Sequence, residues 1–159
     1  MQGHRSLLVV VLLGALAAAG QTPPGGADQG PLRSRVYLQI SPDGSEELEA
    51  LFSTLEDSVA AGEVQPDPVV IVLHGPEALP FLRSNYRNNQ MLVDRAAKLR
   101  AFERIDLRMC ETWMRSNGVG RDQLLPFVNT IPLAPEEVRR LERDGYLPYS
   151  AVRPHSPLL

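Results

Sequence analysis

Residues 68–75 read PVVIVLHG, and this stretch decides the fold. Five consecutive apolar residues, 69–73, lie between Pro68 and the pair His74-Gly75. An unbroken apolar run of this length, rich in Val and Ile, is typical of a strand that is buried on both faces. Such strands occur in parallel sheets whose two faces are covered by helices. The stretch therefore predicts the central strand of an α/β domain.

The segments on both sides of this strand alternate between strand and helix patterns. Strands are expected where polar and apolar residues alternate, and helices where apolar residues recur at three- and four-residue steps. We expect strands at 35–40, 105–110 and 127–131, helices at 45–61, 92–104, 111–117 and 134–144, a short helical turn at 76–82 and a polar loop at 83–90. Asp43 or Ser45 is expected to cap the first helix. The order predicts a three-layer α/β/α sandwich with a mainly parallel sheet of about four to five strands.

The amino terminus has the three-part pattern of a secretory signal peptide. Arg5 precedes an apolar stretch at 7–19, which ends in three alanines. This stretch is shorter than the roughly 20 residues that a spanning helix needs. We expect cleavage after Ala19, no membrane span in the mature form, and a periplasmic or secreted location. The predicted organisation is a signal peptide at 1–19, a Pro- and Gly-rich flexible leader at 20–34, one domain at 35–149 and a frayed tail at 150–159.

Composition excludes several classes of protein. The 159 residues are 43% hydrophobic and 22% charged with a net charge of -3, which is unlike collagen, disordered chains or multi-span membrane proteins. The sequence has sixteen basic residues against nineteen acidic ones and no basic run, so it lacks the basic patch that is typical of nucleic-acid-binding proteins. A single cysteine and three scattered histidines offer no disulfide framework and no metal-ligand spacing. Gly-rich phosphate loops and a serine nucleophile elbow are absent from the sequence, so we expect neither a metal nor a cofactor.

Two features fall at the edge of the sheet where ligands collect in such folds, outside the carboxyl ends of the strands. His74-Gly75 ends the central strand, and Cys110 ends the next one, immediately before a helix. The start of a helix favours thiolate over thiol, which points to a reactive cysteine. The position is equally consistent with an inert Cys110 that is buried as a small apolar side chain. In addition, Glu111 beside the thiol opposes its ionisation. For His74, a structural hydrogen bond and a role near the thiol both stay open.

Further candidates for a binding site lie close to these positions. Thr112 begins the helix after Cys110, and Trp113 lies one helical turn from the thiol, where it could wall a pocket or simply pack in the core. Asn88 and Asn89 could cap the following helix or bind a ligand. The pair Glu136-Glu137 is expected on the solvated face of a surface helix.

Four segments in order carry a resemblance to a known family. They are VVIVLHGPEALPFL (69–82), YRNNQMLVDRAAKL (86–99), IDLRMCETWMRSNGV (105–119) and LLPFVNTIPLAPEEVRRLERDGYLPY (124–149). Over 36–149 the chain resembles the DsrE/DsrF-like family of small α/β proteins associated with sulfur relay, and its exported members best. The resemblance implies a parallel α/β/α sandwich, frequent oligomerisation and a persulfide-carrying cysteine, which here is Cys110. His74 matches a His-Gly position of the family, without an assigned catalytic role. Many exported relatives have a glutamine before the late Gly-Tyr, where this chain has RLERD (140–144).

The leading hypothesis is an exported protein whose Cys110 accepts sulfane sulfur as a persulfide and passes it to a partner thiol. Its expected partners are a sulfur donor or acceptor protein and further copies of the chain. The alternative is a non-catalytic small-ligand or protein-interaction module with a structural Cys110. A redox thiol that forms an intermolecular disulfide is less well supported, because the chain has no second, resolving cysteine.

Overall fold

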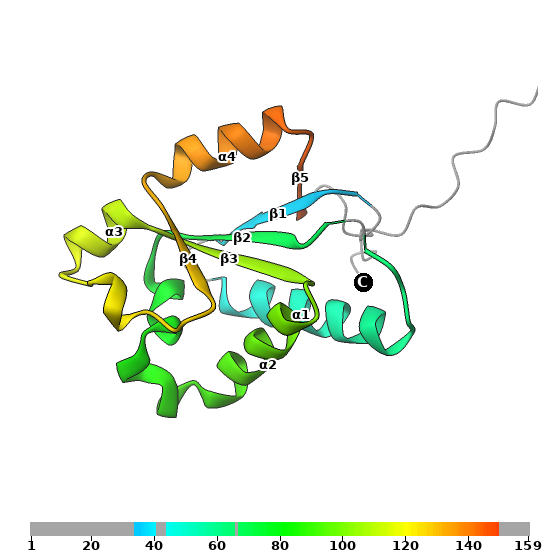
Figure 1. The fold of residues 1–159 in the computed structure, drawn as a ribbon, viewed down its shortest axis with the longest axis horizontal. Coiled ribbons are helices and arrows are strands. Elements are labelled where there is room, and N and C mark those ends of the chain that lie inside the picture. Colours follow the sequence, from blue (N-terminus) through cyan, green and yellow to red (C-terminus); the bar gives the residue numbers. More distant parts are fainter. Residues whose placement is uncertain (1–33, 41–43, 66, 150–159) are drawn as a thin grey trace, which may run out of the picture.

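The fold is an α/β sandwich built on a parallel five-stranded sheet, as predicted (Figure 1). The computed structural model describes residues 34–40, 44–65 and 67–149, so the expected signal peptide, nearly all of the leader and the tail lie outside the described residues. The strands are β1 (Val36–Gln39), β2 (Val69–Leu73), β3 (Ile105–Cys110), β4 (Val128–Ile131) and β5 (Leu147–Pro148). Their order across the sheet is β4-β3-β2-β1-β5, and every neighbouring pair is parallel.

Strand β2 is the central strand, as its apolar run predicts. All five of its residues are buried, because helices cover both of its faces. Val72 pairs with Gln39 of β1 on one side and with Arg108 of β3 on the other. This register aligns the carboxyl ends of β1, β2 and β3 at one edge of the sheet.

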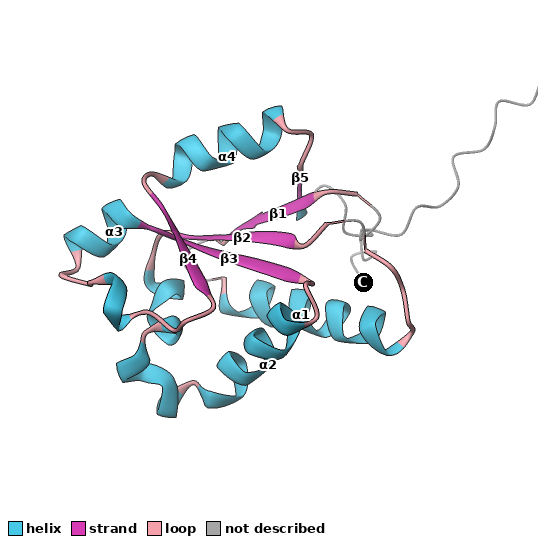
Figure 2. Ribbon diagram, in the orientation of Figure 1, coloured by secondary structure: helices cyan, strands magenta, loops and turns pink. Residues whose placement is uncertain are grey.

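Helices cover the two faces unequally (Figure 2). The helices are α1 (Ser45–Ala60), α2 (Gln90–Ala101), α3 (Glu111–Ser116) and α4 (Ala134–Arg143), with short 3₁₀ segments η1 (Pro76–Phe81), η2 (Arg83–Asn88) and η3 (Arg121–Gln123). Helices α1 and α2 bury the larger apolar cluster on one face. Helix α4 lies on the other face, over β1 and β2.

Strand β3 shows how alternation divides the two faces. Ile105, Leu107 and Met109 belong to the larger cluster beneath α1 and α2. Asp106, Arg108 and Cys110 point to the face that α4 covers, because successive side chains of a strand alternate. The α4 face therefore carries the chemically active side chains of this strand.

The structure departs from the sequence expectations at several element ends. Residues 83–88, expected as a polar loop, form the 3₁₀ segment η2. Helix α2 begins at Gln90 and ends at Ala101, before Glu103 with its positive φ of 55°. Gly44, which has no side chain to offer, occupies the N-cap position of α1, with Ser45 as the first helical residue and Asp43 outside the described residues. Strand β5 was not predicted, since its two residues are too few to show a pattern.

Within the described part of the chain, no helix has the length and apolar character needed to cross a membrane.

Candidate functional site

A pocket of about 280 Å³ opens at the carboxyl ends of the central strands. Gln39 is the last residue of β1, His74 follows β2, and Cys110 is the last residue of β3. The full lining consists of Gln39, His74, Cys110, Thr112, Trp113, Ser116, Leu133, Ala134 and Pro135. This is the edge at which parallel α/β sheets bind ligands. Four of the residues singled out from the sequence therefore meet in one pocket.

The sheet register brings His74 and Cys110 to neighbouring positions. Leu73 pairs with Met109, so the next residue on each chain, His74 and Cys110, continues the same row on the α4 face. Both side chains line the pocket. The thiol and the imidazole, separated by 36 positions in the sequence, thus share one site.

Cys110 is a free cysteine at the floor of the pocket, with 4% of its surface exposed. It packs in the smaller apolar cluster with Ile131 and Ala134. It occupies the N-cap position of α3 but makes no side-chain capping hydrogen bond. Cys110 is therefore a largely buried residue that contributes to the lining of the pocket.

Glu111, which follows the thiol in the sequence, is engaged outside the pocket. Thr130 Oγ1 donates a hydrogen bond to Glu111 Oε1 at 2.8 Å, and Arg121 forms an ion pair with the same carboxylate. The bond from Thr130 and the charge of Arg121 lower the pKa of Glu111 below its ordinary value. The carboxylate of Glu111 is therefore held by Thr130 and Arg121, outside the pocket.

His74 is fixed by two different neighbours. Its Nε2 lies 3.0 Å from Nε2 of Gln39, so the amide, as oriented, donates to an unprotonated ring nitrogen. The backbone N–H groups of His74 and Gly75 both donate to Glu77 Oε1, at 2.7 and 2.8 Å. A Cβ added to Gly75 would lie 2.5 Å from Glu77 Oε2. Gly75 therefore makes room for this carboxylate and does not line the pocket itself.

Thr112 and Trp113 form one wall of the pocket. Thr112 Oγ1 donates to the carbonyl oxygen of Pro132 at 3.1 Å and accepts from Arg115 at 2.9 Å. Trp113 is half-buried and packs against both apolar clusters. Trp113 accordingly fills both roles that its position allowed, as a core residue and as a pocket wall.

Asn88 and Asn89 are not brought to this pocket. Asn88 is exposed at the end of η2. Asn89 precedes α2 but makes no side-chain cap to it. Its amide nitrogen donates to the carbonyl oxygen of Asn85 at 2.9 Å. The expected cap is therefore absent from α2, and a ligand-binding role for Asn88 and Asn89 stays a prediction apart from this pocket.

Sequence reasoning missed five lining residues, Gln39, Ser116 and Leu133–Pro135. Gln39 is the last residue but one of the predicted strand 35–40, and Leu133–Pro135 follow the predicted strand 127–131, so the strand-end rule that selected His74 and Cys110 also applies to them. Ser116 lies one helical turn beyond Thr112 and Trp113. It carried no signal of its own, because a polar residue on a short helix is ordinary.

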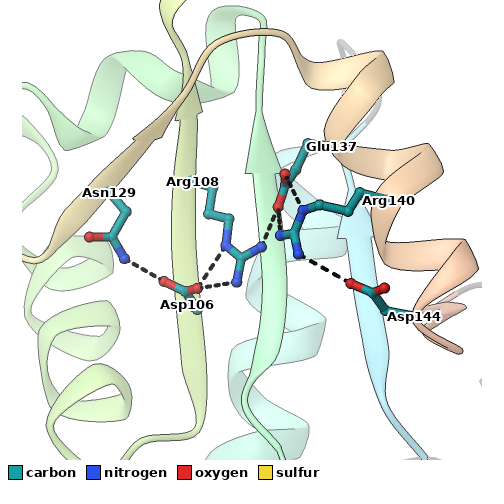
Figure 3. A network of polar contacts seen from close by, with 6 residues as sticks. All are labelled: Asp106, Arg108, Asn129, Glu137, Arg140 and Asp144. Carbon is teal, nitrogen blue, oxygen red and sulfur yellow. Dashed lines mark hydrogen bonds and ion pairs between the residues drawn. The ribbon is translucent and has the colours of Figure 1, made fainter.

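A polar network joins α4 to β3 (Figure 3). Glu137 forms ion pairs with both Arg108 and Arg140. Arg108 also pairs with Asp106 at 2.6 Å, and Asn129 donates to that carboxylate at 2.7 Å. Arg140 completes the network at Asp144, at 3.2 Å. The network anchors the first turn of α4, whose start lines the pocket.

The prediction of a solvated Glu136-Glu137 pair is wrong for one member. Glu136 is exposed, but Glu137 is 9% exposed and faces the sheet. Burial raises the pKa of Glu137, yet the hydrogen bonds from Arg140 and Arg108 outweigh burial and leave that pKa below its ordinary value. Glu137 is therefore a charged member of the packed interface.

Metal binding finds no support in the described residues, among which no cluster of three or more His, Cys, Asp or Glu side chains could hold an ion.

Comparisons with known proteins bear on the fold. No protein-family model matches the sequence, and no curated protein matches it. The structure is similar to that of MTH1491, a protein of unknown function from Methanobacterium thermoautotrophicum, with a TM-score of 0.56 and 18% sequence identity. The match covers 72% of this chain and 98% of that one. At this identity the likeness supports the α/β sandwich and says nothing about activity.

Proposed function

We propose that this protein handles sulfane sulfur, with Cys110 as the thiol that carries it as a persulfide. The observation that supports the proposal is the position of Cys110, a free thiol that ends β3 and lines the pocket beside His74. A pocket at the strand ends gives a small sulfur compound access to an otherwise buried sulfur atom. The resemblance to the DsrE/DsrF-like family suggests the same role for this cysteine.

The reaction is a transfer of one sulfur atom between thiols. The Cys110 thiolate attacks the outer sulfur of a hydropersulfide R–S–SH, the S–S bond breaks, and R–S⁻ leaves with the bonding electron pair. The product is Cys110–S–SH. In the second step an acceptor thiolate attacks the outer sulfur, takes it as its own hydropersulfide and regenerates the Cys110 thiolate. Atoms and charge balance in each step, so no further oxidant is required.

Export and assembly belong to the same proposal. We place the mature protein in the periplasm or outside the cell, on the signal-peptide pattern of residues 1–19. A homo-oligomer, together with a donor or acceptor protein, is the arrangement that the family resemblance implies.

Mass spectrometry tests the sulfur-carrier role. The mature chain, residues 20–159, is exposed separately to inorganic polysulfide and to an alkyl hydropersulfide, and the intact mass is measured. Gain of one sulfur atom from at least one of the two donors is expected, and it must be located at Cys110 because the chain has no other cysteine. The Cys110→Ser variant is the control and should gain none. An unchanged wild-type mass with both donors would contradict the proposal.

The alternative, a binding module with a structural cysteine, is favoured by the 4% exposure of Cys110 and its packing in an apolar cluster. Under this alternative, Cys110→Ser leaves the affinity for a ligand or partner intact, and the wild type takes up no sulfur.

A further inference from the structure

The pocket around Cys110 contains no fixed charge. None of its nine lining residues is Asp, Glu, Lys or Arg, and His74 and Cys110 are its only titratable members. Trp113, Leu133, Ala134 and Pro135 make much of the wall apolar. Arg115 lies behind the lining, where it donates to Thr112 Oγ1 at 2.9 Å. A charged ligand would lose hydration here without gaining a salt bridge to any lining residue, which costs free energy.

The helical segments that begin around the pocket each have a glutamate in their first turn. Helix starts ordinarily attract anions through unpaired N–H groups and the helix dipole. At this edge η1 has Glu77 in its first turn, α3 has Glu111, and α4 has Glu136 and Glu137. Glu111 and Glu137 are held in ion pairs with arginines, so the carboxylates that an incoming anion would meet at this edge are Glu77 and Glu136.

Glu77 makes this effect specific, because it occupies the backbone donors at the end of β2. Its Oε1 accepts from the N–H groups of both His74 and Gly75. Two adjacent backbone N–H groups after a strand would otherwise form a cradle for an anion. In α4, Pro135 at the start of the helix removes another donor, since proline has no N–H.

We propose that the pocket selects an uncharged sulfur compound with a short apolar tail, a thiol or the protonated form of a hydropersulfide, and discriminates against anionic sulfur compounds such as thiosulfate and inorganic polysulfide. The involvement of Cys110 in sulfur transfer rests on the proposed function, whereas the selectivity rests on the pocket lining and on Glu77. The apolar tail packs against Trp113 and Leu133, which places its sulfur toward Cys110.

The test measures binding without chemistry. Trp113 is the only tryptophan of the chain, so its fluorescence reports on the pocket wall alone. The mature Cys110→Ser protein is titrated with three thiols of similar length, 1-propanethiol, 3-mercaptopropanesulfonate and 3-aminopropanethiol. We expect 1-propanethiol to bind about tenfold more tightly than either charged thiol. A sulfonate or amine that binds as tightly as 1-propanethiol overturns the inference, as does a lack of any response to 1-propanethiol.

A substitution at Glu77 provides a second test of the selectivity. Glu77→Gln keeps an oxygen that can accept from both backbone N–H groups but removes the charge, so the affinity for the sulfonate should rise about threefold. Asp57→Asn, an exposed substitution of the same kind on α1, is the matched control and should change nothing. Equal sulfonate affinity in Glu77→Gln and in the parent refutes the role of Glu77. If Cys110 gains no sulfur in the mass measurement, the proposed function is refuted, but the binding selectivity is not. The binding titrations and the mass measurement therefore test the two proposals separately.

Discussion

Arg108 and Glu137 form an ion pair that joins strand β3 to helix α4 across one face of the sheet. Both side chains are mostly buried, with 19% and 10% of their surfaces exposed. Neither group is left with a single partner, because Asp106 also holds Arg108 and Arg140 also holds Glu137. The pair therefore lies within a network in which removing one charge leaves another partly compensated.

Glu137→Gln should lower the free energy of unfolding by about 1 to 2 kcal/mol. The full cost of leaving a buried charge unpaired is larger, but Arg108 keeps Asp106 as a partner. Urea denaturation followed by circular dichroism measures the change. Glu136→Gln is the matched control on the neighbouring, exposed residue, and it should change stability by less than about 0.5 kcal/mol. Equal effects of the two substitutions would show that the network contributes nothing.

The same carboxylate should contribute to acid sensitivity. The pKa of Glu137 in the folded protein lies below its ordinary value of 4.5, so its stabilising effect is present above pH 4.5 and is lost as the pH falls through the folded pKa. The stability difference between wild type and Glu137→Gln should therefore be constant near neutral pH and shrink below pH 4.5. Unfolding curves over a series of acidic buffers measure it. A difference that grows on acidification would contradict the prediction.

Tyr37 should make the fold sensitive to alkali. Burial and the hydrogen bond that its hydroxyl donates to Glu142 at 2.9 Å raise the pKa of Tyr37 from 10 to about 12. Because the folded state prefers the neutral phenol, this stabilising effect is complete below pH 10 and is lost as the pH rises through 12. Tyr37→Phe should lose about 1 kcal/mol near neutral pH and show a shallower alkaline decline. Denaturation curves at neutral and alkaline pH, together with phenolate absorbance, test both effects.

The Gln39–His74 contact predicts the tautomer of the imidazole. With the amide nitrogen of Gln39 donating to Nε2, neutral His74 carries its proton on Nδ1. Nitrogen-15 NMR of the His74 ring should show an unprotonated Nε2 in the wild type. In Gln39→Leu, which removes the donor, the population should move toward the Nε2–H form. A predominant Nε2–H form in the wild type would mean that the amide is turned the other way.

The long elements of the fold could be predicted from the sequence, because their hydrophobic patterns are regular. The run 69–73 identified the central strand, and the alternation in 105–110 matches β3 at both ends. Strand β5 gave no such signal, since Leu147–Pro148 pairs with β1 only through tertiary contact. Helix α2 was extended too far because the apolar Phe102 fits the helical spacing, although its side chain is exposed.

Four of the nine lining residues could be selected from the sequence, His74 and Cys110 by the rule that strand ends converge, and Thr112 and Trp113 by their closeness to Cys110. The same rule covers Gln39 and Leu133–Pro135, but their meeting in this pocket depends on strand order, which no local pattern reports. Glu137 had a signal that was overlooked. It shares a helical stripe with Ala134, Val138 and Leu141, and an acid in such a stripe requires a buried partner.

The two edges of the sheet differ in their capacity to accept an additional strand. Strand β5 has only two residues, and the second, Pro148, has no N–H to donate. Strand β4, at the opposite edge, offers four residues without a proline. Addition of a strand from another molecule is therefore disfavoured at β5. Any extension of the sheet between molecules would be expected at Val128–Ile131.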